Sequence, residues 1–190
     1  MPELPEVETV KNGLAPVMEG FAFDHVTLNR PDLRFPFDPK FIDRVQGQTL
    51  SHLSRRAKFL DAQLGSGDRL LMHLGMSGRF SINQADALGQ FAHSHNTNPK
   101  HDHVIFVMSS GAQIVFNDPR RFGFMLISPR NTLEQHPSFV GLGVEPVGNA
   151  LDAETLALKF SGKRTPLRSF YPNLGYAKTR PVYLCFLRDY

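Results

Sequence analysis

Short apolar runs alternate with turn residues from Phe21 to about Ile127. This alternation restricts the possible folds more than any other feature of the chain. The runs are FAFDHVTL, GQTLSHLSRR, KFLDAQL, RLLMHL, HVIFVMSS, AQIVFND and FGFMLIS. Gly-Ser, Asp-Pro and Ser-Ser-Gly lie between runs, as is typical of β-strands joined by tight turns. Consecutive apolar residues in HVIFVMSS indicate strands buried between two layers. The pattern predicts an α+β fold, mainly β, built around an antiparallel β-sandwich.

Two segments outside the strand region show helical spacing. The apolar residues of the first are Leu4, Val7, Val10 and Leu14. This spacing predicts a short N-terminal helix over residues 5–13, ended by Gly13 and Pro16. A second helix is predicted over residues 151–160, LDAETLALKF. We therefore expect helices to flank the sandwich.

The basic charge of the chain is concentrated at its C-terminal end. Residues 163–190 carry a net charge of +5, and subtracting this from the +3 of the whole chain leaves −2 for residues 1–162. The C-terminal stretch also contains three prolines and shows neither helical nor strand periodicity. We predict a globular domain over residues 1–162 and a divergent basic tail over residues 163–190. Polyanion binding by the domain must then come from local basic patches.

Composition excludes several classes of protein. No apolar run approaches the roughly 18 residues of a membrane helix, so no membrane association is expected. The N-terminus is acidic and lacks the apolar stretch of a signal peptide, which favours a cytoplasmic location. The single cysteine, Cys185, has no partner for an internal disulfide and cannot by itself build a structural zinc site.

The N-terminal sequence MPELPEVETV contains groups that could take part in catalysis. Removal of Met1 would leave Pro2 with a free secondary amine, and an α-amino group has an ordinary pKa of about 8, well below that of lysine. Such an amine can attack a sugar carbon and form an iminium ion, while Glu3 or Glu6 protonates the leaving group. The alternative is that Pro2, Glu3 and Glu6 only favour the start of a helix.

Three turn segments combine basic residues with apolar side chains: RRAKFL (residues 55–60), MHLGMSGRF (72–80) and NDPRRFGF (117–124). Lys58, His73 and the arginines of the third segment suit contacts with phosphates. Met76 and Phe122 are bulky apolar groups on turns and suit insertion between base steps. The alternative is that both pack into the sandwich core, with the basic residues as a solvated rim.

Four histidines lie close together in the segment HSHNTNPKHDHV: His93, His95, His101 and His103. Paired histidines can ligate zinc or copper. No carboxylate or cysteine completes a recognisable spacing, so we favour a structural role and predict no metal site.

Taken together, MPELPEVETV, RRAKFL, MHLGMSGRF, HDHV and NDPRRFG resemble the bacterial formamidopyrimidine-DNA glycosylase family, which includes the endonuclease VIII type enzymes. The resemblance runs from Met1 to about Leu167, in the same order and at similar separations. The Met-Gly-Ser and Pro-Arg-Arg-Phe-Gly elements favour the oxidised-purine branch over the endonuclease VIII branch.

The resemblance implies a bifunctional base-excision-repair enzyme that excises 8-oxoguanine and formamidopyrimidines from double-stranded DNA and then nicks the strand as an AP lyase. It implies that Pro2 is the nucleophile that forms the Schiff base, that Glu3 is the general acid, and that Glu6 belongs to the active-site pocket. The residues implied to contact phosphates or to fill the space left by the extruded base are Lys58, His73, Met76, Arg120 and Phe122. Arg120 would face the orphaned cytosine.

The family pattern continues beyond GKRTP with a helix-two-turns-helix element and a four-cysteine zinc finger, whereas this chain continues with a segment that resembles neither. We therefore expect a monomeric catalytic domain over residues 1–162, with no cofactor, whose activity on duplex DNA is impaired. The alternative is a non-catalytic remnant or a weak DNA-binding module.

Overall fold

The computed structural model describes residues 2–83, 98–129, 139, 142, 145 and 152–162. The chain divides into two compact units, Met1–Leu133 and Glu134–Tyr190. The predicted strand region lies entirely within the first unit, and the predicted second helix lies within the second. The predicted tail over residues 163–190 lies outside the described residues.

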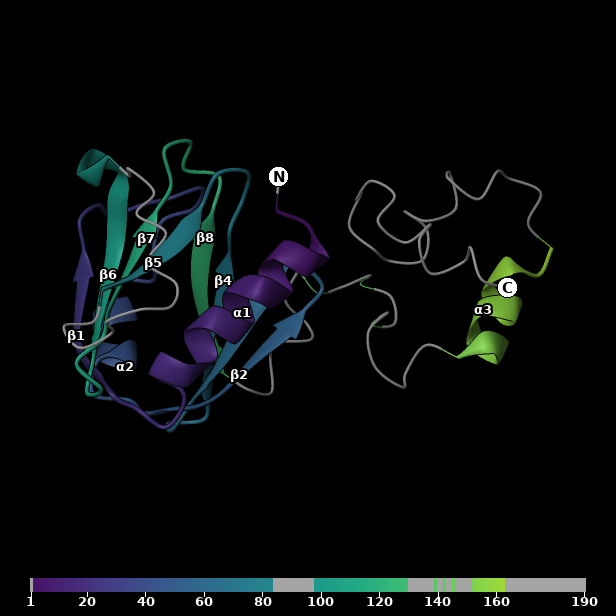
Figure 1. The fold of residues 1–190 in the computed structure, drawn as a ribbon, viewed down its shortest axis with the longest axis horizontal. Coiled ribbons are helices and arrows are strands. Elements are labelled where there is room, and N and C mark those ends of the chain that lie inside the picture. Colours follow the sequence, from purple (N-terminus) through teal and green to yellow (C-terminus); the bar gives the residue numbers. More distant parts are fainter. Residues whose placement is uncertain are drawn as a thin grey trace. The chain divides into compact units, whose positions relative to one another are not determined.

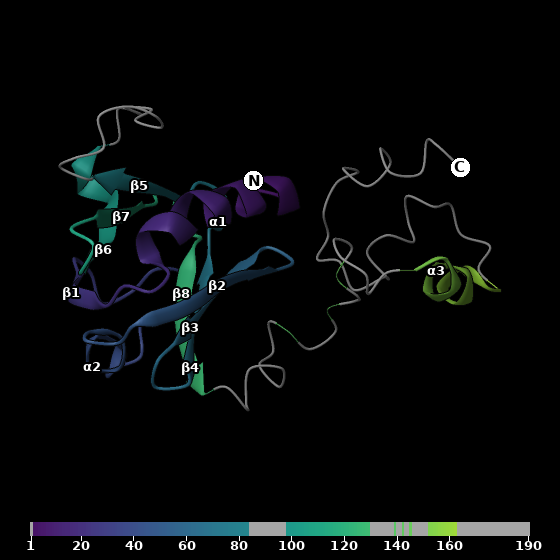
Figure 2. The ribbon, with the colours of Figure 1, turned by 60° about the horizontal axis from the view of Figure 1, so that its bottom comes forward.

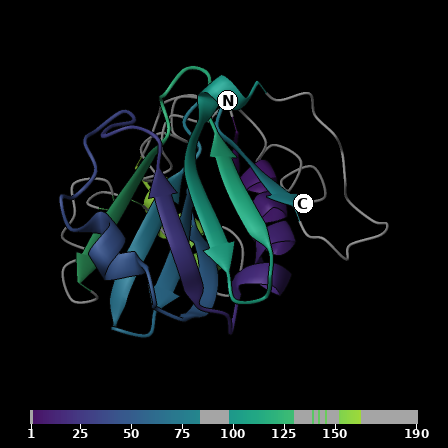
Figure 3. The ribbon, with the colours of Figure 1, turned by 90° about the vertical axis from the view of Figure 1, so that its left-hand side faces the viewer.

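Eight antiparallel strands form two four-stranded sheets in the first unit. The first sheet has the order β1 (Phe23–Leu28), β6 (Asp102–Met108), β7 (Gln113–Asn117) and β5 (Arg79–Asn83), and it faces the viewer in Figure 3. The second has the order β2 (Leu50–Arg56), β3 (Phe59–Leu64), β4 (Asp68–His73) and β8 (Phe124–Pro129). All seven strand predictions are confirmed, and so is the mainly β fold.

Helix α1, Leu4–Met18, packs on β2 and β3 of the second sheet (Figures 1 and 2). It runs well past the predicted end at residue 13, because Pro16 is tolerated in the last turn and Met18 is completely buried in the core. Its other buried residues are Val7 and Leu14, as the helical spacing predicts. One face of α1 is therefore anchored to the sheet from its first turn to its last.

Three shorter helices complete the described structure: α2 (Phe41–Val45), the 3₁₀ turn η1 (Pro99–His101) and α3 (Ala153–Phe160). The predicted second helix corresponds to α3. Strand β5 and helix α2 were not predicted. None of the helices in the described ranges is long and apolar enough to span a bilayer.

The core lies between the two sheets and under α1. Its largest fully buried side chains include four phenylalanines, Phe23, Phe41, Phe106 and Phe116. The rings of Phe23 and Phe106 meet edge to face, with centroids 5.3 Å apart. Burial of these rings makes the sandwich a rigid support for the turns at its ends.

Candidate active site

The start of α1 is fixed by its own carboxylates. Glu3 is the N-cap residue, and its backbone N–H donates to Oε2 of Glu6 over 3.0 Å as part of a capping box. Pro2 lies directly before this cap and is partly buried. Glu6 is exposed. The capping box therefore fixes the backbone at Glu3, directly after Pro2, the residue predicted to be the nucleophile.

Lys58 joins this cap from the turn between β2 and β3. Its Nζ lies 2.9 Å from Oε2 of Glu3, and the residue is only 7% exposed. The ammonium group of Lys58 is thus buried against a carboxylate. Sequence patterns place Lys58 among phosphate-binding residues, and the structure adds a pairing with Glu3 that the sequence does not reveal.

A second ion pair connects α1 to the same turn. Nε of Arg55 lies 2.6 Å from Oε2 of Glu8, and the Arg55 side chain is 4% exposed. Arg55 also donates to the carbonyl of Ala57, whose φ of 53° is unusual for a residue with a side chain. Burial raises the pKa of Glu8, but hydrogen bonds from Lys11 and Arg55 lower it by more, so its net shift is downward. This pair holds the turn that presents Lys58.

His73 ends β4 and faces its cross-strand neighbours Phe59 and Phe124. Its ring stacks on Phe124, with centroids 5.0 Å apart, and its Nδ1 accepts a hydrogen bond from the backbone N–H of Gly75. Burial, followed by the positive charges of Lys58 and Arg34, lowers the pKa of His73 to about 4. At neutral pH the imidazole is therefore uncharged, and because Nδ1 is an acceptor its proton is on Nε2.

The turns that carry Met76 and Phe122 are in direct backbone contact. A Cβ atom on Gly75, whose φ is +63°, would lie 2.3 Å from the backbone N of Gly123 and 2.3 Å from the carbonyl C of Phe122. Met76 is 40% exposed and Phe122 42% exposed, so the alternative that both pack into the sandwich core is wrong. Their turns fold against each other, and the two side chains remain in solvent.

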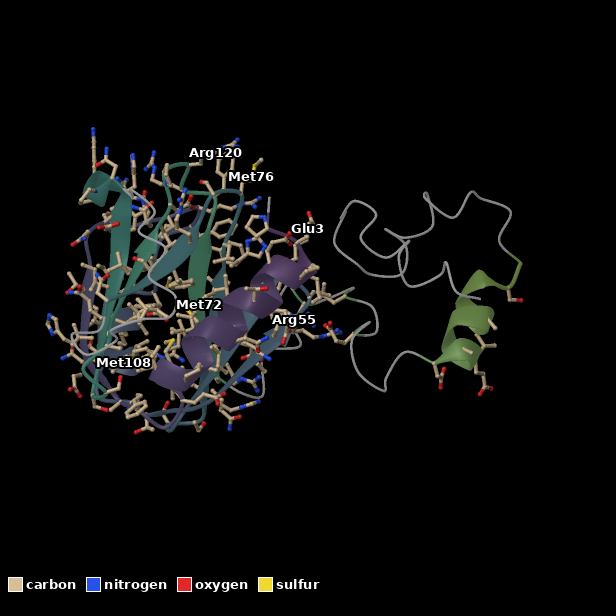
Figure 4. All side chains as sticks on the ribbon, viewed as in Figure 1. Glu3, Arg55, Met72, Met76, Met108 and Arg120 are labelled. Carbon is tan, nitrogen blue, oxygen red and sulfur yellow. The ribbon has the colours of Figure 1, made fainter. Side chains whose placement is uncertain are left out.

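Arg120 lies on the same pair of turns. Its guanidinium carbon lies 4.9 Å from the centre of the Phe122 ring, a cation–π arrangement. Figure 4 shows Arg120 and Met76 close together at the end of the sandwich at which Glu3 begins α1. The structure therefore brings Met76, Arg120 and Phe122 together on two neighbouring turns.

Asp118 holds the two turns together. It is completely buried, and its carboxylate accepts hydrogen bonds from the Ser77 hydroxyl and from the backbone N–H groups of Arg120 and Gly123. In the sequence, Asp118 stands out only as part of an Asp-Pro turn. Its neighbours Ser77 and Gly123 come from different segments, and a local pattern cannot reveal such a contact.

The four clustered histidines lie outside the candidate site, and the structure describes two of them, His101 and His103. His103 is buried, and its Nε2 lies 2.9 Å from the carbonyl O of Asp118. HDHV leads into β6, as predicted. His93 and His95 lie outside the described residues. Within the described ranges, no group of three or more His, Cys, Asp or Glu side chains has a geometry that could hold a metal ion.

The chain is similar in sequence to a known family of proteins. Residues 1–125 match the family described as the formamidopyrimidine-DNA glycosylase N-terminal domain. Curated formamidopyrimidine-DNA glycosylases of Rhodopseudomonas palustris strain BisA53 and Bradyrhizobium diazoefficiens are each 56% identical over 172 residues, which is 89% of this chain. The chain spans 59% of the length of each of these relatives.

Solved structures agree on the fold. Formamidopyrimidine-DNA glycosylase of Lactococcus lactis, bound non-covalently to DNA with an AP site, superposes with a TM-score of 0.73 at 23% identity, over 92% of this chain and 64% of that one. A second Lactococcus lactis structure, with DNA that contains N7-benzyl-Fapy-dG, gives a TM-score of 0.72 at 24% identity, over 92% of this chain and 61% of that one. At these identities the likeness shows the fold alone.

Proposed function

The chain belongs to the formamidopyrimidine-DNA glycosylase family, and we propose that it excises oxidised purines from DNA and cleaves the resulting abasic strand, with Pro2 as the nucleophile. The observation that carries this proposal is the pairing of Glu3 with buried Lys58 at 2.9 Å, directly beside Pro2. An amine nucleophile and a proton-donating pair are the minimum needed for attack at a glycosidic carbon.

The proposed first step breaks the bond between the sugar and the damaged base. The Pro2 nitrogen forms a bond to C1′ of the sugar, and the bonding pair of the glycosidic bond leaves with the base. The departing base takes a proton from the Glu3–Lys58 pair, in which the ammonium of Lys58 can pass a proton to Glu3 over their 2.9 Å contact. The Pro2 nitrogen, protonated by bond formation, returns its proton to this pair. O4′ then takes up that proton as the sugar ring opens, which gives an iminium ion between C1′ and the Pro2 nitrogen.

The proposed second step breaks the strand. The iminium acidifies the proton on C2′. The Glu3–Lys58 pair, now short of one proton, takes it up, and the electron pair of the C2′–H bond expels the 3′ phosphate by β-elimination. Water then hydrolyses the iminium and regenerates the Pro2 amine. Glu6 is exposed within the same first turn of α1 and is the nearest further carboxylate that can exchange protons with the open sugar.

The proposed partner is double-stranded DNA with an oxidised purine or an abasic site. The Lactococcus lactis structures, which hold DNA with an AP site and with N7-benzyl-Fapy-dG, support this choice. Exposed Met76 and Phe122 would occupy the space left by the extruded nucleotide, and Arg120 would face the unpaired base. Neutral His73 would donate Nε2–H to a backbone phosphate, and Lys58 would donate a hydrogen bond to the same backbone while its charge stays paired with Glu3.

The expectations of a monomer, of a cytoplasmic location and of catalysis without a cofactor remain proposals. Sedimentation, cell fractionation and metal analysis of the purified chain test them separately. The alternative is a non-catalytic DNA-binding module. An incision assay distinguishes this module from the proposed glycosylase.

The test is strand incision on three matched duplexes that contain 8-oxoguanine opposite cytosine, an abasic site or no damage, at low and at physiological salt. We expect incision of the two damaged duplexes at low salt and weaker incision at physiological salt, because phosphate contacts lose strength as salt rises. Binding of the abasic duplex without any incision would contradict the proposed activity and favour the binding module.

A further inference from the structure

A compact loop of residues 30–37 lies against the Phe122 turn. Leu33 and Phe37 are buried in the core, and the backbone N–H of Phe37 donates to the carbonyl of Pro31 over 3.1 Å. Between these anchors, Arg34 and Phe35 are exposed, with Phe35 46% exposed. The loop therefore has a fixed base and presents a cation and an aromatic ring to solvent.

Direct contacts connect this loop to the predicted site. The backbone N–H of Arg34 donates to the carbonyl of Gly123 over 3.1 Å. The ring of Phe35 meets Phe124 edge to face at 5.3 Å, and Phe124 in turn stacks on His73 at 5.0 Å. The guanidinium carbon of Arg34 lies 5.5 Å from the centre of the Phe35 ring. Arg34 is thus held beside His73 and the Phe122 turn.

The arginines of the first unit differ in their partners. Four of them pair with carboxylates: Arg30 with Asp32, Arg44 with Asp38 and Asp68, Arg55 with Glu8, and Arg69 with Asp61. In contrast, no carboxylate within the described ranges pairs with Arg34, Arg79, Arg120 or Arg121, all of which are exposed. Of these, Arg34 and Arg120 each stack on an exposed phenylalanine. Arg120 and Arg121 lie on the Phe122 turn, and Arg34 lies on the loop that contacts it, so three of these four guanidinium groups come from this region.

Lys58 and His73, two other basic groups of the face that carries Met76 and Phe122, are less able to attract a polyanion. The charge of Lys58 is already balanced by Glu3. His73 is uncharged at neutral pH and can act only as a neutral donor. Lys58 and Arg34 are the two cations whose charges lower the pKa of His73, and of these two Arg34 is the one without a carboxylate partner among the described residues.

We infer that Arg34, supported by Phe35, is a phosphate-binding residue that extends the DNA-contacting face from His73 and the Phe122 turn onto the loop of residues 30–37. The ligand is the backbone of the DNA duplex, since a guanidinium fork matches phosphate oxygens and the face next to it is the one proposed to meet DNA. This inference rests on the proposed function. Phe35 holds the guanidinium plane and need not touch a base.

The test measures binding of a duplex with an uncleavable tetrahydrofuran abasic analogue by fluorescence anisotropy, from about 50 to 200 mM salt. Arg34→Ala is compared with Arg30→Ala, which removes the same charge from the same loop but from an arginine already paired with Asp32. Arg34→Lys keeps the charge and removes the planar fork.

We expect Arg34→Ala to reduce the slope of log affinity against log salt by about 0.9, so that the loss of affinity over this range becomes about threefold smaller than in the unmodified chain. Arg30→Ala should leave the slope unchanged, and Arg34→Lys should largely preserve it. Equal slopes for Arg34→Ala and the unmodified chain, with the latter still binding, would overturn the inference and leave the proposed function intact. No binding by the unmodified chain, together with no incision of damaged duplexes, would overturn both.

Discussion

The two halves of the candidate site are held in different ways. The helix–hairpin half, which contains Pro2, Glu3, Lys58, Glu8 and Arg55, depends on ion pairs in which Lys58 and the Arg55 side chain are almost completely buried. The paired turns, residues 74–78 and 118–123, depend on backbone contact at Gly75 and on hydrogen bonds to Asp118. In the first half the chemical groups are enclosed, whereas in the second Met76 and Phe122 remain in solvent.

This difference separates reaction from recognition. Groups that move protons work best where solvent is excluded and geometry is rigid. Groups that fill a gap in DNA must be accessible before DNA arrives, and their cost is an exposed apolar surface. Substitutions in the helix–hairpin half should therefore lower both the stability of the fold and the rate of strand incision. Substitutions at the tips of the paired turns should lower DNA affinity and leave stability nearly unchanged.

The largest effect is expected from Lys58→Met. The substitution leaves Glu3 without its cation, and removal of one partner of a buried ion pair typically destabilises a protein by about 3 kcal/mol. Urea unfolding measures the change, and incision of an abasic duplex should be lost in the same variant. In the double variant with Glu3→Gln, the loss of stability should be smaller than the sum of the two single losses. Additive losses would contradict a direct Glu3–Lys58 interaction.

A slightly smaller effect is expected from Gly75→Ala. The new methyl group would meet the backbone of Phe122 and Gly123 at 2.3 Å, so the paired turns must move apart, at a cost of about 2–3 kcal/mol. Gly67→Ala is the matched control, since Gly67 also has a positive φ, of +89°, but has open space around it. That variant should lose about 1 kcal/mol. Equal losses for the two variants would contradict the close contact of the turns.

His73 should give the fold a measurable pH dependence. Its pKa is about 4 in the folded protein and about 6.5 when unfolded, so the unfolded chain takes up the proton first as the pH falls. Stability is unaffected above pH 6.5 and decreases from there towards pH 4. Between pH 7 and pH 5 the unmodified chain should lose about 1–2 kcal/mol more than a His73→Gln variant in urea unfolding. Parallel pH profiles would mean that His73 is not buried as a neutral ring.

The smallest effect on stability is expected from Phe122→Ala. Because the ring is 42% exposed, the free energy of unfolding should change by less than about 0.5 kcal/mol. Affinity for a duplex with an abasic analogue should nevertheless fall about tenfold, the usual contribution of an aromatic ring that stacks on a base. A variant that is destabilised but binds normally would reverse the proposed division between the two halves.

Local patterns in the sequence predict much of this structure. Strand runs and turn residues are local features, which is why seven strands and the mainly β fold follow from them. The end of α1 was predicted too early, because burial of Met18 outweighs the helix-ending tendency of Gly13 and Pro16. Strand β5 was missed because Arg79–Asn83 directly follows a glycine-rich turn and contains only two apolar residues, Phe80 and Ile82.

The site follows less completely from the sequence. The predicted residues Glu3 and Lys58 meet, and so do the turns of Met76 and Phe122. The supporting pairs could not be predicted, because Glu8 and Arg55 are 47 positions apart and Ser77 and Asp118 are 41 positions apart. Arg34 was missed for the same reason: its significance depends on contacts with Gly123 and with the aromatic row of Phe35 and Phe124.

The most direct test of the account is sodium borohydride trapping on a duplex with one abasic site at low salt, with an intact-mass check for removal of Met1. An abasic site needs no lesion recognition, so trapping isolates the amine chemistry of the helix–hairpin half. The account predicts a covalent adduct that maps to the N-terminal peptide and is strongly reduced in Pro2→Gly. No adduct from a folded protein that lacks Met1 and binds the duplex would contradict it.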